Sequence, residues 1–119
     1  MTDFKVVNVP GMLSVPVKSY DKHGNEIPDD GEWHRHTVTT QYVLAEFLVA
    51  KGLVDGVFSV DRKPDLIIMR SQLSPAGQAF VRASSDKWLR FIDRIGTTEA
   101  TMMQKLERRW RTFNEPNAS

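Results

Sequence analysis

The chain has 119 residues, of which 40% are hydrophobic and 26% are charged, and it contains no cysteine. This length predicts one domain covering residues 1–119, and the composition excludes a disordered chain. Without cysteine, neither a disulfide framework nor a thiolate metal site is possible, which is typical of a reducing compartment, so we expect a cytoplasmic protein. The N-terminus lacks a signal-peptide pattern. The longest apolar segment, residues 42–54, is too short to cross a bilayer, so we expect no membrane partner.

The net charge of +1 is unevenly distributed along the chain. Residues 1–60 hold 5 Lys/Arg and 8 Asp/Glu, whereas residues 61–119 hold 11 and 7, so the two halves carry −3 and +4. A basic C-terminal half permits contact with phosphates or with an acidic partner. A solvated helix surface explains the same asymmetry, and we favour this simpler interpretation.

The N-terminal third, residues 1–36, is predicted to be β-rich, irregular and rich in loops. Residues 4–20 are β-prone, but two prolines and a glycine interrupt any long strand. Gly24 and Asn25 adopt positive φ angles at low cost, so the segment around them predicts a hairpin tip. A second loop is predicted at residues 28–31, followed by a short strand at residues 33–38.

The first predicted helix covers residues 39–51, where apolar side chains recur at helical spacing. Thr39 or Thr40 can cap its start, and Gly52 stands where a left-handed residue usually ends a helix. Two apolar runs, residues 57–60 and 66–69, then predict a β-hairpin around a polar tip. The apolar positions of the helix are Tyr42, Val43, Leu44, Phe47, Leu48 and Ala50.

Two further helices are predicted towards the C-terminus. Ser74 can cap the first of them, with Pro75 at its first position, and Gly96 ends it. Thr97 or Thr98 opens the last helix. One face of the helix that begins at Pro75 contains Val81, Ser84, Trp88, Phe91, Ile92 and Ile95, and a stripe on the last helix contains Met102, Leu106, Trp110 and Phe113.

The sequences Ala-Lys-Gly-Leu-Val at residues 50–54 and Gln-Leu-Ser-Pro-Ala-Gly-Gln-Ala-Phe-Val at residues 72–81 carry a family resemblance. Together with the predicted hairpin between them, they resemble the C-terminal half of a winged helix-turn-helix domain. The pattern is also similar to small prophage-type proteins of unknown function. The resemblance implies an α+β fold with a winged-helix-like core at residues 37–95 and an added C-terminal helix at residues 96–113.

In winged-helix proteins the helix before the wing usually enters the major groove, and the wing touches the DNA backbone or the minor groove. The resemblance therefore implies a DNA-binding transcriptional regulator. The sequence departs from the family pattern in two ways. Residues 1–36 lack the two helices that normally precede the recognition helix, and Glu46 is unfavourable near phosphates. The implied nucleic-acid contacts are Thr39, Thr40 and Gln41 on the helix and Arg62 and Lys63 on the wing.

Catalytic and metal-binding patterns are weak in this sequence. His34 and His36 would face the same way on a strand and are candidate metal ligands, but no third ligand has a diagnostic spacing. There is no nucleophile motif and no glycine loop for phosphate. We therefore expect no enzyme, no cofactor, no metal and no catalytic residue.

The last helix predicts a different function. Its apolar stripe lies beside a basic edge at the chain end, so it either packs within the molecule or docks on a partner. We predict a non-catalytic protein-interaction module, in the manner of a small accessory or inhibitory protein of a phage or mobile element. Its partner is another protein or a second copy that forms a homodimer through this helix. The proposed contacts are Met102, Leu106, Arg108, Arg109, Trp110 and Arg111.

Overall fold

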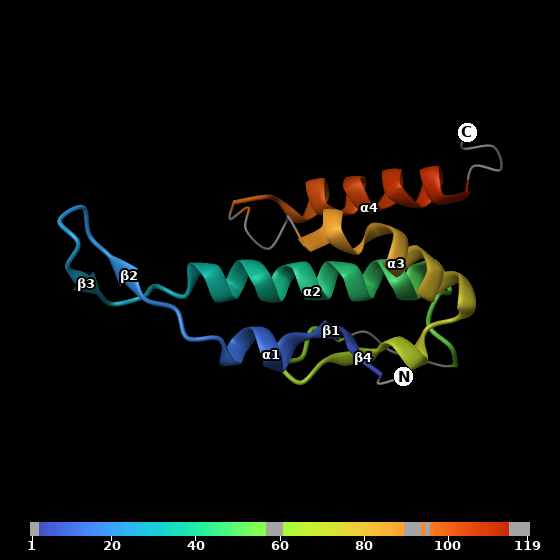
Figure 1. Cartoon of the computed structure of the whole chain (residues 1–119), viewed down its shortest axis with the longest axis horizontal. Coiled ribbons are helices and arrows are strands. Elements are labelled where there is room, and N and C mark those ends of the chain that lie inside the picture. Colours follow the sequence, from blue (N-terminus) through green and yellow to red (C-terminus); the bar gives the residue numbers. More distant parts are fainter. Residues whose placement is uncertain (1–2, 57–60, 90–93, 95, 115–119) are drawn as a thin grey trace.

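A computed structural model describes residues 3–56, 61–89, 94 and 96–114, without the side chains of residues 85–89. Over these residues the protein is a mixed α+β chain with four helices and two small two-stranded antiparallel sheets (Figure 1). In chain order the elements are β1 (Lys5–Asn8), α1 (Val9–Ser14), β2 (Ser19–Tyr20), β3 (Glu26–Ile27), α2 (Glu32–Ala50), β4 (Ile67–Met69), the 3₁₀ turn η1 (Arg70–Gln72), α3 (Pro75–Leu89) and α4 (Glu99–Asn114).

Helix α2 is the centre of the fold. In Figure 1 the sheet of β1 and β4, together with α1, covers one side of α2, while α4 and α3 cover the opposite side. Burial of apolar side chains between these layers is the main stabilising term for such a small chain. The core consists of residues from every layer, among them Val7, Val9, Val43, Phe47, Leu48, Ile68, Phe80, Met102 and Leu106.

The main sheet joins a strand near the N-terminus to a strand in the middle of the chain. β1 and β4 run antiparallel, with Val7 opposite Ile68, and both side chains are fully buried. The predicted strand at residues 66–69 is therefore confirmed, but its described partner is β1 rather than residues 57–60. Those four residues lie outside the described part of the chain. The winged-helix arrangement is not confirmed, because the strand pair seen here is formed with the N-terminus.

The prediction of a strand at residues 33–38 is wrong, because this segment belongs to the first two turns of α2. Gly31 adopts a left-handed conformation with a φ of 77°, and its carbonyl accepts a hydrogen bond from Arg35 N at 2.9 Å. The Asp30 carboxylate accepts a hydrogen bond from Glu32 N at 2.9 Å, which satisfies a donor at the helix start. These contacts start the helix well before Thr39, so neither Thr39 nor Thr40 is a cap.

The expectation of an extended segment over residues 4–20 holds for β1 and fails directly after it. Asn8 ends the strand and caps α1, because its side-chain oxygen accepts a hydrogen bond from Gly11 N at 3.0 Å. Pro10 lies in the first turn of this helix, where its missing N–H costs nothing. The interruption predicted from Pro10 and Gly11 is thus a short helix.

Several predicted turns are confirmed. Gly52 ends α2 with a φ of 67°, and Leu53 and Val54 then fold back into the core. Ser74 caps α3 by accepting a hydrogen bond from Gly77 N at 3.1 Å, and Pro75 is the first residue of that helix. The predicted tip around Gly24 joins β2 to β3.

Gly77 is also a packing requirement. A Cβ atom at this position would lie 2.6 Å from the backbone oxygen of Leu53, which is closer than side-chain carbon atoms approach backbone. The same oxygen accepts a hydrogen bond from Ser74 N at 2.8 Å. The start of α3 is therefore held directly against the segment that follows α2.

The faces of the last two helices are partly as predicted. On α3, Phe80 and Ser84 are buried and Val81 packs at the edge of the core. The predicted face continues with Trp88, Phe91, Ile92 and Ile95, whose side chains lie outside the described residues. On α4, which Thr98 caps through a 3.2 Å hydrogen bond from Thr101 N, the stripe faces the core.

None of the described helices is long and apolar enough to span a membrane.

Candidate functional site

The helix residues proposed to contact DNA do not form an exposed surface. Thr40 is fully buried and Gln41 is only 4% exposed. The Gln41 side-chain oxygen accepts a hydrogen bond from Asn8 N at 3.0 Å and so connects α2 to β1. The Thr39 hydroxyl donates to the Arg35 carbonyl of its own helix at 2.7 Å. These side chains support the fold, and their burial is incompatible with base recognition by Thr40 and Gln41.

Arg62, proposed as a wing-tip contact, is tied to two helices. Its guanidinium pairs with Glu46 of α2 at 2.8 Å and with Glu99 of α4, and it lies over the Tyr42 ring at 5.7 Å. Hydrogen bonding by Arg62 lowers the pKa of the Glu99 carboxyl below its ordinary value of 4.5. The neighbouring Lys63 is exposed, and its one ion pair within the described residues is with Asp61, at 3.7 Å. Of the two proposed wing cations, only Lys63 faces solvent without a link to the core helices.

This network predicts a pH-dependent contribution to stability. Because the folded-state pKa of Glu99 is lowered, the contribution is present above the ordinary value of 4.5 and is lost as the pH falls through the lower folded value. We expect Arg62→Ala to lower the free energy of unfolding by about 0.5–1 kcal/mol at pH 7, a small value because the pairs are half-exposed. The loss should shrink towards zero at low pH, below the lowered folded-state pKa of Glu99.

Urea unfolding of the two proteins at both pH values measures this difference. Lys63→Ala is the matched control, since it removes an adjacent cation that does not join the helices. An Arg62→Ala penalty of equal size at pH 7 and at low pH would show that lost packing on Tyr42, rather than ion pairing, is responsible.

His34 and His36 do not share a face. On a helix, side chains two positions apart point about 200° apart, so the strand geometry behind the metal hypothesis is absent. His36 is buried. In residues 3–56, 61–89, 94 and 96–114, no three His, Asp or Glu side chains are grouped as a metal site would require.

The stripe proposed to bind a partner is largely used within the molecule. Met102 and Leu106 are buried against α2, and Trp110 packs partly buried with its ring 5.3 Å from that of Phe80. The alternative of internal packing is therefore correct for Met102 and Leu106. The basic residues differ: Arg108 and Arg111 are exposed and Arg109 is half-buried.

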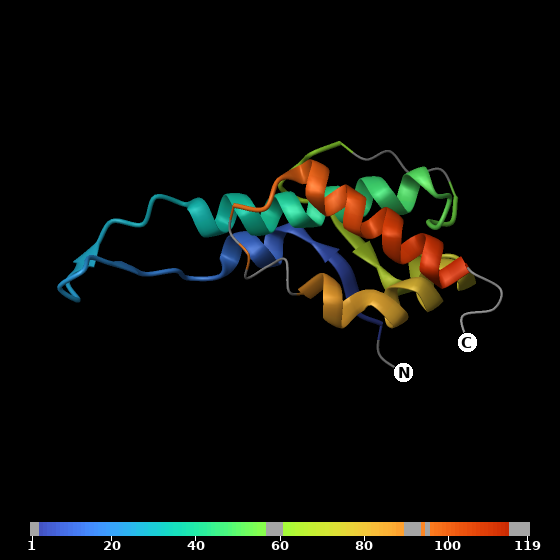
Figure 2. The same ribbon diagram turned by 90° about the horizontal axis from the view of Figure 1, so that it is seen from above.

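The hairpin of β2 and β3 is a surface feature for which the sequence predicted no functional role. Residues 15–31, here called the arm, extend away from the layered body at one end of the molecule (Figures 1 and 2). Its Tyr20 and Ile27 side chains are 57% and 42% exposed. Six large hydrophobic residues are exposed in the described chain, and four of them fall in residues 13–27, so apolar surface is concentrated on this segment.

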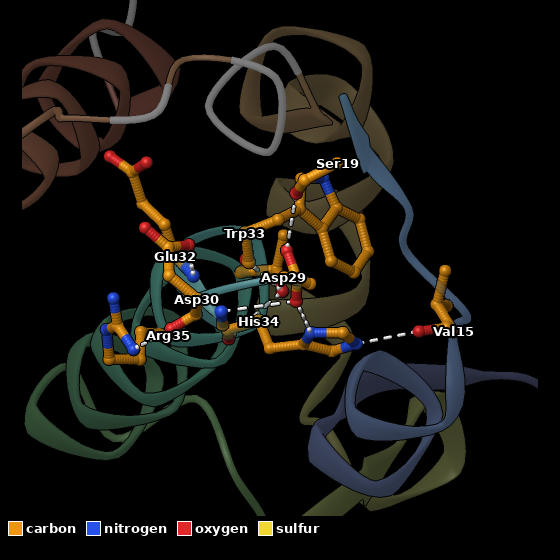
Figure 3. Close-up of polar contacts among 10 residues, drawn as sticks. Val15, Ser19, Asp29, Asp30, Glu32, Trp33, His34 and Arg35 are labelled. Carbon is orange, nitrogen blue, oxygen red and sulfur yellow. Dashed lines mark hydrogen bonds and ion pairs between the residues drawn. The ribbon is translucent and has the colours of Figure 1, made fainter. Parts of the chain in front are cut away.

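The base of the arm is firmly held, as Figure 3 shows. His34, in the first turn of α2, donates from Nε2 to the Val15 carbonyl at 2.6 Å, while its Nδ1 lies 3.9 Å from the Asp29 carboxylate. Asp29 accepts hydrogen bonds from the Ser19 hydroxyl at 3.0 Å and from Gly31 N at 3.1 Å. Both strands of the arm are thus fixed to one another and to α2, and the tip projects from a rigid base.

One signal in the sequence could have identified the arm. The hairpin turn at Gly24 was predicted, and the segment flanking it contains Tyr20 and Ile27 but no alternating apolar face. A hairpin with one apolar side chain on each face cannot bury both against the same body. Such a pattern indicates a hairpin that lies free of the core.

A hollow lies between the start of α2 and the start of α4. Its volume is about 340 Å³, and Glu32, Arg35, His36, Thr39 and Glu99 are among its lining residues. Glu99 is already paired with Arg62 and the Thr39 hydroxyl with its own helix, so these groups are not positioned to act on a ligand. We therefore regard the arm as the stronger candidate site.

With the fold and this arm described, comparison with known proteins adds no relative: no family model, no curated protein and no solved structure matches the chain significantly.

Proposed function

We propose that this protein is a non-catalytic protein-interaction module and that the arm is its docking element. The observation that carries the proposal is the exposed pair Tyr20 and Ile27 on a hairpin with a rigid base. An isolated two-stranded hairpin is marginally stable in water, and this one has only two residue pairs in its ladder. A partner that covers it would bury the apolar side chains and extend the sheet.

The fixed base supports the same proposal. A docking element that is already held in one conformation loses less entropy on binding than a free loop does. The contacts of His34 and Asp29 provide this order without covering the tip. The accessory or inhibitory role in a phage or mobile element that the sequence resemblance implies is compatible with this proposal, since such a protein acts by contact.

The test is a pull-down with the tagged full chain, as wild type and as an arm variant. The extract comes from its source cells and is supplemented with the untagged chain, and the bound protein is compared between the two baits. We expect the double variant Tyr20→Ser/Ile27→Ser to bind its partner at least about tenfold more weakly, as loss of an apolar anchor does. Phe4→Ser is the matched control, because Phe4 is 50% exposed but lies on the body. Unchanged binding by the arm variant would overturn the proposal.

A nucleic-acid-binding function remains a second candidate, supported by the exposed cations Lys105, Arg108 and Arg111 on α4. This surface differs from the wing of the winged-helix hypothesis. If it contacts phosphates, anisotropy of a labelled mixed-sequence duplex should show binding that weakens steeply with salt. Arg108→Ala and Arg111→Ala should each reduce that salt dependence.

A further inference from the structure

We propose that the arm docks on helix α4 of a second copy of this chain, in a reciprocal homodimer with twofold symmetry. This inference rests on the proposed function, since it names the partner that the arm contacts. It is drawn from the charges of the two surfaces, from the apolar residues beside those charges, and from the positions of the two surfaces on the molecule.

The arm and α4 have opposite charge. The arm contains 2 Lys and 4 Asp or Glu, and Glu32 follows directly, so residues 15–32 carry −3. Helix α4 contains 4 Lys or Arg and 2 Glu, which gives +2. Opposite potentials guide two surfaces together and fix their register.

The acidic residues of α4 are already neutralised within the molecule. Glu99 pairs with Arg62, and Glu107 pairs with Lys51 at 2.9 Å. Within the described residues, by contrast, the basic side chains of α4 form no ion pair, and neither do Glu26 and Glu32 at the arm. The unpaired cations are Lys105, Arg108, Arg109 and Arg111. Each of the two surfaces therefore carries charges that the described fold leaves without an ion pair.

Apolar side chains accompany both sets of charges. Ser19 is opposite Ile27 and Tyr20 is opposite Glu26, so Tyr20 and Ile27 point to opposite faces of the arm. On α4, Phe113 is 36% exposed and stacks on Trp110 with ring centroids 5.9 Å apart. The face of the arm that carries Tyr20 and Glu26 can thus pack on this aromatic pair while Glu26 approaches Arg109, which lies four residues before Phe113 on the same helix surface.

The positions of the two surfaces fit a reciprocal contact. The molecule is 53 Å long, with the arm at one end and the C-terminal end of α4 towards the other (Figures 1 and 2). A twofold rotation that lays two copies side by side and antiparallel brings each arm to the other copy's α4. Both contacts form at once, and neither surface is left over to bind a third molecule.

Sedimentation of the full-length chain at micromolar concentration tests the dimer, and a charge exchange tests its geometry. One variant carries Arg108→Glu and Arg111→Glu, so that arm and helix are both negative. The other carries Glu26→Lys and Glu32→Lys, so that both are positive. We expect wild-type dimers that weaken with salt, at least about tenfold weaker self-association of each variant, and a heterodimer when the two variants are mixed.

Three results would overturn this inference. A wild-type chain that sediments as a monomer, a dimer that survives both charge reversals, or a mixture that fails to associate would each exclude the arm and α4 as the interface. If the monomeric chain still retains another protein through Tyr20 and Ile27, the proposed function stands and only the second copy is excluded. If instead the arginine variant loses binding to a mixed-sequence duplex, α4 is a nucleic-acid surface.

Discussion

Replacing Phe80 by alanine is expected to lower the free energy of unfolding by about 3–5 kcal/mol, the largest effect of any single substitution considered for this chain. Phe80 is 1% exposed and lies at the centre of an aromatic cluster. Its ring is 5.6 Å from that of Phe47 on α2 and 5.3 Å from that of Trp110 on α4, in tilted and edge-to-face arrangements. Alanine would leave a cavity where three helices meet and remove the aromatic contacts as well.

Urea unfolding followed by circular dichroism measures this change. Phe4→Ala is the matched control, because it removes the same side chain from a half-exposed position just before β1, and we expect a loss below about 1 kcal/mol there. Equal losses in the two variants would mean that the cluster around Phe80 contributes little to holding α3 against the other helices.

The parts of the fold that the sequence predicted correctly depend on neighbouring residues. Gly52 ends α2, Ser74 and Pro75 start α3, and Thr98 caps α4, as expected from the preferences of these residue types. The start of α2 was missed, although Asp30 and Glu32 are typical of a helix N-terminus. The β-branched and aromatic residues that follow locally favour a strand, whereas the packing of α2 against the rest of the molecule favours the helix.

The remaining parts depend on contacts between distant residues. β4 pairs with β1, more than half the chain away, and no local pattern selects that strand over residues 57–60. Gln41 likewise looks like an exposed polar residue until its contact with Asn8 N on β1 is known. Gln41 and Arg62 were therefore assigned to a ligand although they connect elements of the protein to one another. Thr40 was assigned in the same way, although it is buried and bonds Thr37 of its own helix.

The same limit applies to α4 and to the arm. Helical spacing identifies which side chains share a face, but it does not tell whether the covering surface belongs to the same chain. Met102 and Leu106 are covered within the molecule, whereas Tyr20 and Ile27 remain exposed in the described part of the chain. The candidate docking surface therefore moves from the apolar side of α4 to the arm, and the basic side of α4 remains available.

Replacing Leu106 by alanine separates these two roles of α4. Leu106 is buried next to Met102, so its truncation is expected to lower the free energy of unfolding by about 2–5 kcal/mol. If the stripe were instead a docking surface, the same substitution would weaken partner binding and leave stability nearly unchanged. One interpretation predicts a loss of stability and the other a loss of partner binding, so a single variant distinguishes them.

The measurement is a urea unfolding curve alongside sedimentation of the same sample under conditions where at least nine-tenths of the variant is folded. Gln104→Ala is the matched control, because Gln104 is exposed on the same helix, and its effect should be within about 0.5 kcal/mol. We expect folded Leu106→Ala to keep the wild-type association, since the arm contacts the exposed basic side of α4 and not its buried side. A stable Leu106→Ala chain that no longer associates would return the interface to the apolar stripe and exclude the arm as its main element.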